Sequence, residues 1–146
     1  MKLFQIEEPD GAPLDSDELG AAVGIDIEAG VGRVAIAVGG NAEILPDADG
    51  NRILRASSKQ VPLAALLLGL RSQAEKQLAR PVTHAVIVAA RGKHATLERA
   101  AEAAGIAILK LIEREAAAAL AKGAAAAEAP VLGAAISAED LAPQPA

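Results

Sequence analysis

Residues 23–38 read VGIDIEAGVGRVAIAV, and this stretch decides the fold of the chain. Two runs rich in β-branched and small apolar residues, Val23–Glu28 and Arg33–Val38, flank a short connection that contains Gly30 and Gly32. Strand-forming runs on either side of a glycine turn are typical of a β-hairpin. The stretch therefore predicts two antiparallel strands.

Asp26 is the acidic residue inside the first of these runs. A buried strand rarely holds a carboxylate unless that group is paired or takes part in function. Asp26 is therefore the first candidate site residue. The structural interpretation is that its carboxylate accepts hydrogen bonds from neighbouring backbone amides, and we favour this interpretation over a catalytic role.

Outward from the hairpin, the patterns predict three more strands and three helices. A glycine turn at 39–41 leads into a third strand, and an apolar stripe at helical spacing begins near Gln60 or Pro62. The further predicted elements are a strand at Ala42–Leu45, a helix to Leu78, a strand at Val82–Ala89, a helix at Ala95–Ala104, a strand at Ile106–Ile112 and a helix at Arg114–Lys122 closed by Gly123. The order βββαβαβα predicts an α/β fold of the ribonuclease-H-like kind, a five-stranded mixed sheet with helices on both faces.

The two ends of the chain differ from this central part in composition. Residues 1–21 are acidic and turn-rich, which predicts a flexible leader before a lobe at 22–123. Residues 124–146 are rich in alanine and proline. Ala124–Ala129 has helix-forming composition, but we expect an unstructured tail from Pro130 onwards.

Composition excludes several classes of function. The chain has 146 residues, a net charge of −5 with acids and bases interspersed, no cysteine and a single aromatic residue. Neither nucleic acid nor an anionic membrane surface is an expected partner, and thiol chemistry is excluded. His84 and His94 have no second imidazole at helical spacing, so no metal site is predicted from them. The longest apolar run, at 61–70, is too short to cross a bilayer, and no signal peptide precedes it, so a cytoplasmic location is expected.

Four segments, in order, resemble the seventy-kilodalton heat-shock chaperone family of the actin-like ATPase superfamily. The first, GIDIEAGVG at 24–32, is similar to the family's phosphate loop GIDLGTTNS, in which a strand Asp helps to hold Mg²⁺. The others are NAEILPDADGNR at 41–52, RPVTHAVIVAA at 80–90, similar to the segment ending in PAYF, and AAGIAILKLIEREAAAALAKG at 103–123, similar to the segment with NEPTAAALAYG. The leader LFQIEEPDGAP resembles that of the iron–sulfur-assembly branch. The resemblance implies the first lobe of a chaperone ATPase, with Gly24, Asp26, Gly30 and Gly32 as a vestigial phosphate loop.

The chain departs from the family at most positions that carry the chemistry. Ala29, Gly30 and Val31 stand where the phosphate loop has two threonines and an asparagine, and Glu28 replaces a glycine. Arg114 stands at the position of the family's catalytic glutamate. The segment that carries the catalytic lysine is missing, as are the second phosphate loop and the adenosine-binding half. Because phosphoryl transfer needs several charges positioned together, Asp26 alone implies little or no turnover.

Three functions remain open. The first is a chaperone-related, non-catalytic module that either is a vestigial remnant or binds a protein partner or a second copy. Its binding face would carry Ala117, Ala118 and Ala121, which are expected to be exposed. The second is a weak ATP–Mg²⁺ binder that completes its cleft by dimerisation, with Asp26 in the second coordination shell of Mg²⁺. The third is a Rossmann-type dinucleotide binder, because 30–35 fits G-x-G-x-x-G/A, although that motif requires a following helix.

Overall fold

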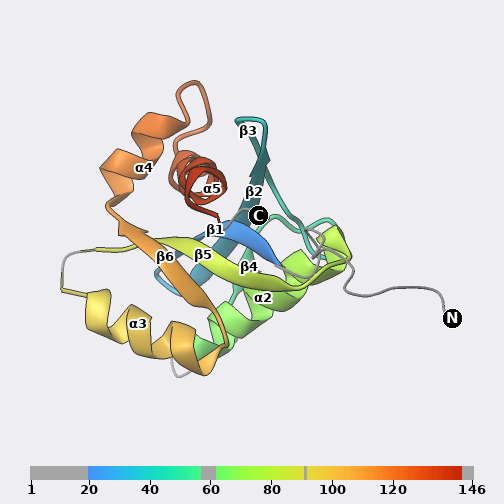
Figure 1. Ribbon diagram of the computed structural model, residues 1–146, viewed down its shortest axis with the longest axis vertical. Helices are drawn as coiled ribbons and strands as arrows, with labels where there is room; N and C mark the ends of the chain where they lie inside the picture. The colour runs from blue at the N-terminus through green and yellow to red at the C-terminus, as the bar shows by residue number, and fades with distance from the viewer. Residues whose placement is uncertain (1–19, 57–61, 91, 143–146) are drawn as a thin grey trace, which may run out of the picture.

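The computed structural model describes residues 20–56, 62–90 and 92–142. Within these ranges the strands and helices form one sheet with helical layers on both of its faces (Figure 1). The elements are β1 (Ala21–Glu28), β2 (Val31–Val38), β3 (Asn41–Ile44), β4 (Leu54–Arg55), α2 (Leu63–Leu78), β5 (Val82–Val88), α3 (His94–Ala103), β6 (Ala107–Ile112), α4 (Arg114–Leu120) and α5 (Ala129–Leu141).

The sheet is mixed, as the sequence predicts. Its order is β3-β2-β1-β5-β6, with β4 paired to β2 beside this path. The pairs β1–β2 and β2–β3 are antiparallel, whereas β5 runs parallel to both β1 and β6. The α/β class and the antiparallel arrangement of the first three strands are confirmed. The prediction of five strands is wrong for the described residues, because the two-residue strand β4 is too short to leave a pattern in the sequence.

Alternation along β1 assigns its side chains to two separate cores. Val23 and Ile25 pack in one buried cluster with residues of α2 and α3. Gly24 and Asp26 point to the other face of the sheet, which α4 and α5 cover (Figure 1). A carboxylate on β1 therefore lies beneath the two C-terminal helices.

Helix α5 corrects the expectation of an unstructured tail. Residues 129–141 form a helix whose buried positions include Val131, Ala134 and Ala138. Pro130 suggests a break, but it lies in the first turn, where proline is tolerated. The helix is buried on several sides, so its sequence lacks the polar stripe that reveals an amphipathic helix. The last residues of that predicted tail, 143–146, lie outside the described residues, as do 1–19 of the predicted leader and the predicted helix start near Gln60.

Polar contacts fix both ends of α5. The carboxylate of Glu139 accepts hydrogen bonds from the backbone N–H groups of Gly39, at 2.6 Å, and Gly40, at 2.8 Å, in the β2–β3 turn. Glu128, just before the helix, accepts two hydrogen bonds from Arg52, at 2.8 and 2.9 Å. These contacts join residues 76 to 100 positions apart in the chain. They set the position of α5 along the sheet.

The face of α4 that sequence analysis expects to be exposed is covered instead. Ala117 is fully buried and Ala121 is 8% exposed, while Ala118 is partly buried. Gly133 of α5 lies directly against the backbone of Ala117. The expectation of an open face at Ala117, Ala118 and Ala121 is therefore wrong, because α5 packs on it.

Candidate functional site

Asp26 lies near the carboxyl end of β1 and is 2% exposed. Its two carboxylate oxygens accept hydrogen bonds from Arg114, Oδ2 from Nη1 at 2.9 Å and Oδ1 from Nη2 at 2.8 Å. The interpretation that backbone amides hold Asp26 is wrong, since the structure shows a guanidinium in that role. A charge-assisted pair with this fork geometry is among the stronger polar contacts in proteins.

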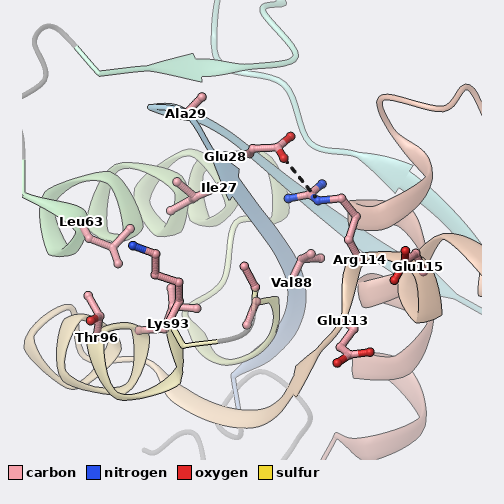
Figure 2. Close-up of a pocket in the computed structure, with 13 residues that line it drawn as sticks. Ile27, Glu28, Ala29, Leu63, Val88, Lys93, Thr96, Glu113, Arg114 and Glu115 are labelled. Atoms are coloured by element: carbon pink, nitrogen blue, oxygen red, sulfur yellow. Dashed lines mark ion pairs between the residues drawn. The ribbon is translucent and has the colours of Figure 1, made fainter.

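Arg114 is the first residue of α4, and its side chain is 36% exposed. The hydrogen bonds with Asp26 raise the pKa of the guanidinium above its ordinary value, although partial burial opposes this. Its Nε also lies 3.6 Å from Oε2 of Glu28, the contact that Figure 2 marks with a dashed line. The structure thus joins two positions that sequence analysis singled out separately, Asp26 and Arg114, and places Glu28 beside them.

A cavity of about 690 Å³ opens next to this pair, at the carboxyl ends of the parallel strands β1 and β5. Such ends are where ligands bind in open α/β sheets. Lys93 extends from the start of α3 towards Leu63, and Arg114 extends from α4 towards Glu28 (Figure 2). The lining residues are Ile27, Glu28, Ala29, Leu63, Val88, Ala89, Ala90, Lys93, Thr96, Leu97, Glu113, Arg114 and Glu115. The lining of the cavity therefore combines apolar side chains with charged ones of both signs.

The three glycines and one aspartate expected to form a phosphate loop do not line one site. The β1–β2 turn consists of Ala29 and Gly30, both with positive φ, and Gly32 lies within β2. Gly24 lies inside β1, where a side chain would collide with the backbone of Ala134 and Ala135 of α5. Close packing against a helix thus accounts for a glycine at position 24.

Arg33 is a residue of this region that sequence analysis did not single out. It is the cross-strand partner of Asp26 in the β1–β2 register, so both side chains point to the α4–α5 side of the sheet. The position of the hairpin turn in the sequence could have predicted this pairing. A two-residue turn at Ala29–Gly30 pairs positions whose numbers sum to 59, which places 33 opposite 26.

Neither histidine joins a cluster of three or more metal-ligating side chains in the described residues. Nδ1 of His84 lies 2.7 Å from Oγ1 of Thr83, and His94 begins α3. Across residues 20–56, 62–90 and 92–142, no group of three or more metal-ligating side chains gathers in one place.

No model of a known protein family matches the chain, and no curated protein matches it significantly. The helices in the described part of the chain are all too short or too polar to cross a membrane.

The glycines at 30 and 32 lie at the turn and the start of strand β2, where a dinucleotide fingerprint would need a helix. The Rossmann-type interpretation is therefore dropped.

Proposed function

We propose that this chain is a chaperone-related, non-catalytic module with a ribonuclease-H-like fold, similar to the first lobe of a seventy-kilodalton heat-shock chaperone ATPase. The ordered sequence resemblance and the mixed sheet support this proposal, because an antiparallel β1–β2–β3 unit continues into parallel β5 and β6. The resemblance of the leader supports the iron–sulfur-assembly branch. Genes for iron–sulfur assembly beside its own gene would strengthen that assignment.

The ion pair between Asp26 and Arg114 is the observation that supports a non-catalytic role. A carboxylate that helps to hold Mg²⁺ must present a free oxygen to the cation or its water. Both oxygens of Asp26 instead accept hydrogen bonds from one guanidinium, whose positive charge occupies the place next to the carboxylate. The residues present therefore do not fit Mg²⁺ at Asp26, and no phosphoryl-transfer step follows from them.

The β1–β2 turn also disfavours the binding of a polyphosphate. Glu28 precedes the turn with its side chain 67% exposed, and a carboxylate there repels phosphate oxygens. Ala29 offers no side-chain donor. A weak ATP-binding protein that completes its cleft by dimerisation remains the second candidate, favoured only by the 690 Å³ cavity at the carboxyl ends of β1 and β5.

Calorimetric titration with ATP–Mg²⁺ tests both candidates. We expect a Kd weaker than about 1 mM, equivalent to about −4 kcal/mol, and hydrolysis no faster than that of Asp26→Asn. Binding in the micromolar range that tracks dimerisation would support the second candidate. Hydrolysis above the Asp26→Asn control would overturn the non-catalytic proposal.

A non-catalytic module acts through a partner, and we propose a protein partner or a second copy, in the cytoplasm. Nucleic acid and membranes are not proposed, given the net charge of −5 without a basic cluster in the sequence. Since α5 covers Ala117 and Ala121, a partner at α4 would meet Leu120, which is 48% exposed.

A further inference from the structure

A second hollow, of about 460 Å³, lies on the α4–α5 side of the sheet, and we call it the arginine groove. Its floor comes from the end of β1, β2 and β4, and its opposite wall comes from α4 and the connection to α5. Its lining residues are Glu28, Val31, Arg33, Ile53, Arg55, Arg114, Glu115, Ala118, Ala126, Ala127 and Pro130. It shares only Glu28, Arg114 and Glu115 with the cavity at the ends of β1 and β5.

Three guanidinium groups from three elements line the arginine groove. Arg33 is on β2, Arg114 is on α4 and Arg55 is on β4. Arg55 pairs with Val31 of β2, and Val31 is two residues before Arg33 on the same strand. Residues two apart on a strand share a face, so Arg33 and Arg55 lie on the same side of the sheet. The pairing of the short strand β4 with β2 therefore brings them together.

Among the described residues, two of these three cations, Arg33 and Arg55, form no ion pair with a carboxylate within 4.0 Å. Arg114 is engaged by Asp26 and Glu28, and each oxygen of Asp26 accepts a hydrogen bond from Arg114. The Nε–H of Arg33 is buried and finds no hydrogen-bond acceptor in the described part of the chain. Leaving a buried charged donor without an acceptor is costly, so an acceptor from outside the chain is favoured.

The nearby carboxylates do not fill this role. Glu128 is close enough to Arg33 for the arginine to lower its pKa, but its two oxygens are bonded to Arg52. Glu28 and Glu115 border the groove, and a ligand must approach past them. The two acids repel an anion in proportion to its charge, just as the guanidinium groups attract it, so the preference among anions depends on the geometry of the hydrogen bonds.

We propose that the arginine groove binds the phosphoryl dianion of a small phosphate monoester. Planar guanidinium forks match the oxygens of phosphate and donate paired hydrogen bonds to them. Arg33 and Arg55 both line the groove, and Arg55 offers its donors from the more exposed side. The Nε–H of Arg33 is covered by protein atoms, so it donates to a ligand only after a local shift of the arginine side chain. Val31, Ile53 and the small residues of the α4–α5 connection form an apolar border for a short organic substituent.

Arginine-selective NMR of the ¹⁵N-labelled full chain tests this site directly. Inorganic phosphate, ethyl phosphate and acetate are titrated at constant ionic strength set with sodium chloride. We expect a saturable shift of the Arg33 Nε–H resonance with both phosphates, with ethyl phosphate binding at least as tightly. Acetate should bind at least about tenfold more weakly.

Three variants that each remove one positive charge distinguish binding at the groove from nonspecific electrostatic attraction. Arg33→Gln and Arg55→Gln should each weaken ethyl phosphate binding at least about tenfold, since each removes a hydrogen bond to a charged group. Arg99→Gln, at an exposed position on α3, removes the same charge away from the groove and should change affinity less than about twofold. Arg55 is exposed, so its variant remains informative even if Arg33→Gln does not fold. Equal losses in all three variants, equal binding of acetate, or no saturable shift at Arg33 would each overturn the proposal.

Discussion

Substitution of Gly133 by alanine tests the packing of α5 on α4. Helix propensity predicts a gain in the free energy of unfolding, whereas packing predicts a loss. Gly133 lies inside α5, where an exposed glycine-to-alanine change gains about 0.8–1.0 kcal/mol of stability. A Cβ at this position would instead overlap the carbonyl oxygen of Ala117 in α4. Backbone cannot rotate away as a side chain can, so α5 and α4 must move apart. Overpacking of this kind costs roughly 1–3 kcal/mol and outweighs the gain in propensity.

Gly69 provides the matched control, since it also lies inside a helix, α2. A Cβ there would lie 2.8 Å from Cδ2 of Leu54, the end of a flexible side chain on the short strand β4. Urea unfolding should show Gly69→Ala unchanged or more stable by up to about 1 kcal/mol, and Gly133→Ala less stable by at least about 1 kcal/mol. Stabilisation by both substitutions to the same degree would refute the packing of α5 on α4.

Three further outcomes follow from the polar contacts and the surface. Arg114→Gln should lower the free energy of unfolding by roughly 1–3 kcal/mol by leaving a buried carboxylate unpaired, and adding Asp26→Asn should recover part of that loss; a strictly additive double variant in urea unfolding would contradict the pair. The hydrogen bonds from Arg52 lower the pKa of Glu128 below its ordinary 4.5, so the stability they add is present above that pH and lost as the pH falls through the lowered value. Arg52 is 55% exposed, so less than about 1 kcal/mol is involved, and Arg52→Gln should remove this part of the acid loss in unfolding measured from pH 6 to 3. If a partner or second copy binds at α4, Leu120→Glu should abolish the association in analytical ultracentrifugation, and an unchanged complex would exclude that surface.

The strands near the start of the chain could be predicted because their pattern is local. Alternation and the turn glycines at 39 and 40 set β1, β2 and β3 to within about two residues of their observed bounds. The apolar run at 82–89 likewise predicted the strand β5. Strand β4 was not predictable in this way, because its two residues are placed only by pairing with β2.

The candidate site required contacts between remote residues, which no local pattern contains. The partner of Asp26 is 88 positions away, and only the sequence resemblance pointed to both Asp26 and Arg114. The nature of their contact, a bidentate ion pair, came from the fold. Helix α5 was missed for a related reason, because its small residues form no amphipathic pattern. Its place is set by close backbone contacts at Gly24 and Gly133, which join segments remote in the sequence.

The position of α5 in the chain also bears on how the protein folds during synthesis. Its helix packs on β1, β2 and β5, so one face of the sheet is covered by the element that is synthesised last among those described. Until that helix emerges, only α4 covers the face of the sheet that holds Ala35, Val86 and Val88. Chains interrupted before residue 129 would present this surface to each other, and such surfaces favour aggregation. Synthesis of α5 is thus coupled to completion of the core, and termination before this helix yields a species prone to aggregation.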